Sequence, residues 1–198
     1  MKRKMRTMVA LLVAGGLISA GGAFGQTNDG VPYVTVRKSE SKKVRLYTQA
    51  PVEMAIIDAD GTTLYRGDVK AKLAGVTVLN LTNLPDGHYY LTATNNDFWT
   101  SQGLTVQNDQ VRVDAQNTTT LVKPTLIPYG KNKFEIAMPG TQTLNVALYD
   151  ESNALVFNET YQKGDVHRFD LNKLPSGNYT FVVGPDSKQF TEQIAVQR

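Results

Sequence analysis

Few side chains in this sequence have the types and spacing that catalysis requires. The 198 residues include two histidines, His88 and His167, and no cysteine. Neither histidine lies in an H-x-H or H-E-x-x-H pattern, and no serine lies in a G-x-S-x-G turn, so no zinc site or activated serine is indicated. The lack of cysteine excludes thiol chemistry. We therefore expect surface histidines and assign no catalytic residue, no metal ligand and no cofactor.

An acidic turn is the one place where a cation could bind. Asp58 and Asp60 precede Gly61, as at the start of a calcium loop. An EF-hand needs glutamate at its twelfth position, which here is Val69. The pattern favours a hairpin turn, in which Asp and Gly satisfy the backbone. A calcium site completed by other loops is the alternative.

An aromatic pair is the best candidate for ligand binding. Phe98 and Trp99 follow the polar residues 95–97 (Asn-Asn-Asp). An exposed tryptophan beside amides can stack on a sugar ring or anchor a protein partner. Residues 185–187 (Pro-Asp-Ser), at the corresponding place later in the chain, contain no aromatic side chain. Trp99 as a core residue is the alternative, and the one we favour.

The N-terminus has the pattern of a secretory signal peptide. Basic residues precede an apolar stretch from Met8 to about Ala20, and small residues lead to a predicted cut before Gln26. The apolar stretch is shorter than the roughly 20 residues that span a bilayer, although a retained anchor is the alternative. Residues 1–25 hold four basic and no acidic residues, which leaves 17 basic and 18 acidic residues. We expect export, membrane contact only during export, and no nucleic-acid binding.

The elements that position these side chains repeat once along the chain. Residues 54–58 (Met-Ala-Ile-Ile-Asp) resemble residues 146–150 (Val-Ala-Leu-Tyr-Asp) at an offset of 92. Residues 81–89 and 171–179 share five of nine positions at an offset of 90. Each copy contains about seven short runs of alternating apolar and polar residues between turn residues. This pattern predicts an all-β chain of two tandem immunoglobulin-like β-sandwich domains.

The predicted boundaries follow from the repeat. A signal peptide covers residues 1–25, and the first domain covers 26–107. Residues 108–120, which are polar, form a linker or a short extra strand, with a hinge near Asn117 as one outcome. The second domain covers 121–198.

The best-matched block predicts a structural corner. In both copies a Leu-Pro-x-Gly-x-Tyr sequence offers a preset proline turn, a glycine able to adopt positive φ, and a tyrosine whose ring is buried while its hydroxyl bonds nearby backbone. We assign this motif a folding role. Its members are Leu84, Pro85, Gly87 and Tyr89 in the first copy, and Leu174, Pro175, Gly177 and Tyr179 in the second.

The second copy resembles a known family on these residues. An apolar strand ending at Asp150, the Leu155-Val156 pair, residues 174–179 and a last amphipathic strand from Gln189 to Val196 are similar to the C-terminal sorting and secretion domains of exported Bacteroidetes proteins. Asn153 stands where that family has glycine. The resemblance implies a secreted β-sandwich.

These observations predict an exported, non-catalytic protein in the periplasm, on the cell surface or in the medium. We expect adhesion-type binding of an envelope or surface protein, or of a glycan, through loops or strand edges. A structural or accessory role in an envelope or secretion-system assembly is the alternative. An enzyme whose site the sequence does not reveal is the third hypothesis.

Overall fold

The structure is a computed structural model that describes residues 33–70, 76–163 and 165–198. This part of the chain is all-β and contains no helix, in agreement with the predicted class. Within it, no helix is long and apolar enough to cross a membrane. The predicted signal peptide, residues 1–25, lies outside the described residues.

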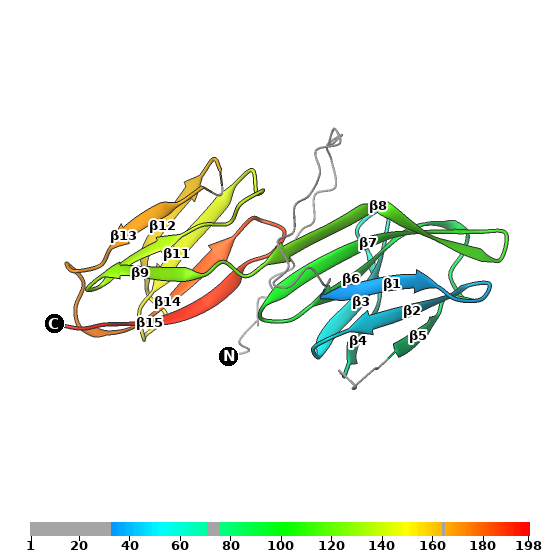
Figure 1. Ribbon diagram of the computed structural model, residues 1–198, viewed down its shortest axis with the longest axis horizontal. Helices are drawn as coiled ribbons and strands as arrows, with labels where there is room; N and C mark the ends of the chain where they lie inside the picture. The colour runs from blue at the N-terminus through cyan, green and yellow to red at the C-terminus, as the bar shows by residue number, and fades with distance from the viewer. Residues whose placement is uncertain (1–32, 71–75, 164) are drawn as a thin grey trace, which may run out of the picture.

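Eight strands form two sheets in the first half of the chain, which we call the first unit (Figure 1). A three-stranded sheet has the order β1-β2-β5, and a five-stranded sheet has the order β4-β3-β6-β7-β8. Adjacent strands are antiparallel. The strands are β1 (Val34–Lys38), β2 (Lys43–Thr48), β3 (Val52–Asp58), β4 (Thr63–Val69), β5 (Val76–Asn80), β6 (Gly87–Thr94), β7 (Phe98–Gln107) and β8 (Gln110–Val122).

Seven strands form the second unit with the same order. The sheet β13-β10-β9 corresponds to β5-β2-β1, and the sheet β12-β11-β14-β15 corresponds to β4-β3-β6-β7. The predicted repeat is thus reproduced strand by strand, apart from β8. The strands are β9 (Leu126–Gly130), β10 (Lys133–Ile136), β11 (Leu144–Tyr149), β12 (Leu155–Tyr161), β13 (His167–Asp170), β14 (Gly177–Gly184) and β15 (Phe190–Val196).

Each unit has its own hydrophobic cluster. Alternate residues of a strand point to one face, so the apolar alternation of both sheets fills the space between them. In the first cluster Leu46 of β2 and Leu91 of β6 are almost fully buried. In the second cluster the same is true of Ile136 of β10 and Phe181 of β14.

The segment between the repeats differs most from expectation. Residues 108–120, predicted as a linker or short strand, contain most of β8, which pairs with β7 from Gln110 to Val122. The register shifts between Gln102 and Gly103, whose partners are Thr118 and Asp114. Gln102 is buried, and its amide bonds backbone oxygens of β8 while accepting from the Thr118 hydroxyl at 2.8 Å. Asn117 therefore lies in a bulge of a paired strand. Of the two predicted alternatives the structure shows the extra strand, which is longer than expected, and not a linker with a hinge.

Candidate functional site

The two Leu-Pro-x-Gly-x-Tyr corners have the same geometry. The Tyr89 hydroxyl donates to the Pro85 carbonyl oxygen at 2.8 Å, and the Tyr179 hydroxyl donates to that of Pro175 at 2.9 Å. Both tyrosines are 5% exposed. The corner closes one end of each core.

One detail of the predicted corner was wrong. Gly87 and Gly177 were expected to adopt a positive φ, but neither glycine does so. Each instead opens the strand that follows the turn. A Cβ on Gly87 would lie 3.4 Å from the Tyr89 hydroxyl oxygen, which is an ordinary contact distance, so the tyrosine ring packs directly on this glycine.

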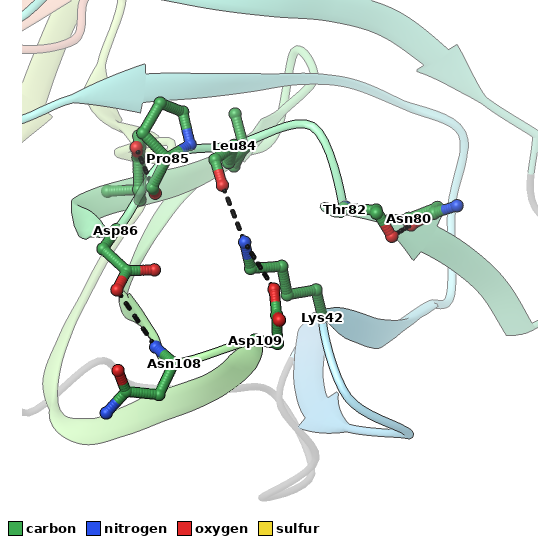
Figure 2. A network of polar contacts seen from close by, with 9 residues as sticks. Lys42, Asn80, Thr82, Leu84, Pro85, Asp86, Asn108 and Asp109 are labelled. Carbon is green, nitrogen blue, oxygen red and sulfur yellow. Dashed lines mark hydrogen bonds and ion pairs between the residues drawn. The ribbon is translucent and has the colours of Figure 1, made fainter.

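In the first unit a polar network joins this corner to two neighbouring turns (Figure 2). The largely buried Lys42 donates from Nζ to the Leu84 carbonyl oxygen at 3.1 Å and pairs with Asp109 at 3.3 Å. The Asn108 amide donates to the Asp86 carboxylate at 3.1 Å. The network ties the corner to the turn before β2 and to the turn between β7 and β8.

In each of the two acidic turns an aspartate side chain accepts hydrogen bonds from backbone amides, as the hairpin interpretation predicts. Oδ1 of Asp58 accepts the amides of Asp60 at 3.0 Å and Thr62 at 2.8 Å. The equivalent Asp150 accepts those of Ser152 and Ala154. Hydrogen bonds from Ser152 first, then from Ala154, lower the pKa of Asp150.

These turns offer little to a cation. Among the described residues, no three acidic or histidine side chains gather where they could hold a metal ion. Asn153, the departure from the family pattern, has φ +60° and Gly61 has φ +85°, so both supply the left-handed residue of the turn.

Both histidines lie on strands at the surface. The ring Nδ1 of the exposed His88 lies 3.2 Å from the Thr105 hydroxyl. His167 stacks on Tyr161 with ring centroids 3.8 Å apart. Burial, with a hydrogen bond to Glu159, raises the pKa of Tyr161 to about 12. Neither histidine has a carboxylate partner among its hydrogen bonds.

The aromatic pair does not form a joint ligand platform. Phe98 is 1% exposed and stacks on Tyr33, with ring centroids 4.8 Å apart. Trp99, the next residue of β7, points to the opposite face and is half-buried between its strand neighbours Thr94 and Leu121. Phe98 as a ligand contact was wrong, because it belongs to the core.

Exposed apolar residues occur instead on several strands, among them the edge strands β4 and β12. On β4, Leu64 is 45% and Tyr65 is 54% exposed, and on β12, Leu155 is 55% and Val156 is 39% exposed. Within the described chain β4 pairs only with β3, and β12 pairs only with β11.

The same irregularity marks both edges. The register shifts between Ile56 and Ile57 opposite β4, and between Leu148 and Tyr149 opposite β12. The shift leaves Leu64 and Val156 without a direct partner on the neighbouring strand, at equivalent places in the repeat. Since the cores do not bury these side chains, we take the two edges as the candidate site.

The second unit matches a known family. Residues 130–197 match the secretion system C-terminal sorting domain family. The match confirms the resemblance of the second unit to sorting domains and implies export to the cell surface or secretion. The matched residues include the Asp150 turn, the β12 edge and the corner of Tyr179.

Other comparisons add little. No curated protein matches the chain. A solved structure titled "Biofilm associated protein - BSP domain" is similar with a TM-score of 0.29 and 19% identity, over 83% of this chain and 29% of that chain. The chain thus spans less than a third of that protein's length.

Proposed function

We propose that this chain is a non-catalytic, exported adhesion-type protein of two immunoglobulin-like domains that binds a partner protein through its sheet edges. An edge strand has unpaired backbone N–H and C=O groups along one side, and an extended segment of another protein can add to it as a further strand. The exposed apolar residues of β4 and β12 would contact the side chains of the added segment.

The observation that carries the proposal is the repetition of an unburied apolar residue at the same bulge of both edges. Leu64 and Val156 belong to neither hydrophobic core, whereas the shared corner and aspartate residues hold turns and the shared buried residues fill the interior. The sorting-domain match supports an exported Bacteroidetes protein. Binding of a glycan at Trp99 is a second form of this role, and it has less support because Trp99 is half-buried.

A charged residue on the edge tests the proposal. Val156→Lys places an ammonium group where an added strand would lie, and Val166→Lys makes the same change at an exposed residue just before β13. We expect wild type and Val166→Lys to recover the same protein from envelope extract and to bind it after purification, while Val156→Lys does not. Identical recovery by all three proteins would contradict the proposal.

The same experiment separates the accessory role. A stoichiometric set of secretion or envelope subunits, recovered with every variant, would favour a structural subunit held through other surfaces.

A further inference from the structure

A row of residues crosses the outer face of the sheet β1-β2-β5. Arg37 of β1 lies directly opposite Arg45 of β2, which lies opposite Val78 of β5. Both arginines are exposed. Like charges directly opposite each other on neighbouring strands destabilise a sheet. This row therefore calls for an explanation other than folding.

The second unit has the same row with a different charge. Ile127 lies opposite Glu135, which lies opposite Arg168, and these are the positions 90 residues after Arg37, Arg45 and Val78. The Arg168 Nε atom lies 2.7 Å from the Glu135 carboxylate. The row of the second unit is thus neutral, whereas that of the first unit carries two positive charges.

The neighbouring row shows the same contrast. Lys43 lies opposite Asn80, and the equivalent Lys133 lies opposite Asp170 with 3.1 Å between Nζ and the carboxylate. Among the residues that the structure describes, the acidic group paired with Lys43 is the exposed Glu40 of the preceding turn, 3.8 Å away.

Aromatic and apolar surface lies beside these cations. The Arg37 guanidinium lies 5.5 Å from the centre of the Tyr47 ring. Val76 and Val78 of β5 are exposed on the same sheet. Among the described residues neither Arg37 nor Arg45 takes part in an ion pair. Guanidinium groups bind carboxylate and sulfate oxygens in pairs, and rings with apolar side chains pack on sugar faces.

We propose that the outer face of β1-β2-β5 binds an acidic polysaccharide through Arg37, Arg45 and Lys43. This inference rests on the proposed exported binding role but does not involve the edge strands β4 and β12. An open sheet face suits an extended polymer, and export brings the face into contact with extracellular glycans. The chain without residues 1–25 has one more acidic than basic residue, so it lacks the overall positive field typical of nucleic-acid binders.

Retention on immobilised polysaccharide tests the proposal with matched variants. Arg45→Glu places in the first unit the residue that the second unit has at Glu135. Lys131→Glu makes the same charge change at an exposed turn of the second unit. We expect wild type and Lys131→Glu to bind heparin and alginate but not neutral dextran. We expect Arg45→Glu to bind about tenfold more weakly, the loss expected for one charge-assisted contact.

The outcomes are distinct. No binding of wild type to heparin or alginate at low salt would overturn the proposal, as would equal losses in Arg45→Glu and Lys131→Glu. Equal binding of duplex DNA or of phosphatidylglycerol vesicles would overturn the polysaccharide assignment. A melting temperature of Arg45→Glu that is no lower than that of wild type excludes unfolding as the cause. Val156→Lys, the edge variant, should bind polysaccharide like wild type, so this inference and the edge proposal can fail separately.

Discussion

At the scale of single residues, the shared positions of the two units mostly satisfy backbone groups. Tyr89 and Tyr179 each bring a hydroxyl to a proline carbonyl at the closed end of a core. Asp58 and Asp150 each accept two backbone amides of a turn. A buried or partly buried carbonyl without its donor costs free energy, so these residues hold turns that the apolar pattern alone would leave undefined.

Removing one hydroxyl tests the corner. Tyr179→Phe keeps the buried ring and leaves the Pro175 carbonyl without its donor. We expect the free energy of unfolding, measured by urea denaturation, to fall by about 0.5–1.5 kcal/mol. Tyr65→Phe, at a tyrosine that is 54% exposed, is the control and should leave stability unchanged. Equal effects of the two substitutions would show that the hydroxyl bond adds nothing.

The acidic turn predicts a pH dependence. Because the pKa of Asp150 is lowered in the folded protein, its stabilising effect is present above the ordinary value of 3.8 and is lost as pH falls through the lower folded value. We expect Asp150→Asn to be less stable than wild type at neutral pH, with the difference shrinking at about pH 2. A difference in unfolding free energy that stays constant with pH would argue against this assignment.

At the scale of elements, the sequence predicts strands well where one side is apolar. The strands that contain Ile136 and Phe181 could be predicted because their alternate residues are apolar and fill a core. The full length of β8 was not predicted, because only its first part contributes an apolar residue to the core, Val111, whereas the contacts of its second part are polar. The Thr120 hydroxyl lies 2.9 Å from that of Thr100, and Thr118 bonds Gln102. A strand held by hydroxyl and amide pairs has the composition of a linker.

The candidate surfaces were harder to predict than the strands. Phe98 could not be assigned to the core without knowing which face of β7 is inward. Arg37 and Arg45 lie on different strands, so their juxtaposition depends on register. Only the apolar pair near Val156 was visible beforehand, through the family pattern, and the sequence did not show that it lies on a free edge.

The β7–β8 bulge predicts an intolerant glycine. A Cβ on Gly103 would lie 2.6 Å from the Asn117 Nδ2 atom and 2.9 Å from its Cβ. We expect Gly103→Ala to lower the unfolding free energy by about 1–3 kcal/mol, the range for overpacking. Adding Asn117→Gly should restore part of the loss. Gly130→Ala, whose Cβ would be 3.5 Å or more from its neighbours, is the control; an equally large effect there would refute the explanation.

The like charges on the outer face of β1-β2-β5 lead to a prediction about stability as well as about binding. Arg45→Glu replaces the two like charges of Arg37 and Arg45 on neighbouring strands with a pair of opposite charges. We expect thermal and urea unfolding to show a gain of about 0.2–1 kcal/mol. A loss of stability would mean that Arg45 supports the fold, and would weaken the argument that it is there for a ligand.

At the scale of the whole molecule, one module is present twice with different surfaces. The sheet orders, corners and acidic turns agree, while the outer faces differ in charge and only the first unit extends its sheet with β8. Residues near the junction link the units: the Lys123 amide donates to the Asp97 carbonyl oxygen at 2.7 Å, and Lys123 Nζ pairs with Glu192. Shared features therefore specify folding, and unshared ones are where we expect distinct ligands.

Hydrogen exchange of the protein bound to its purified partner tests strand addition most directly, because an added strand would hydrogen-bond amides that now face solvent. The account predicts new protection of amides in β12, in β4, or in both, with little change in the residue 95–97 and 185–187 loops. Protection confined to those loops, with both edges exchanging as in the unbound protein, would contradict it.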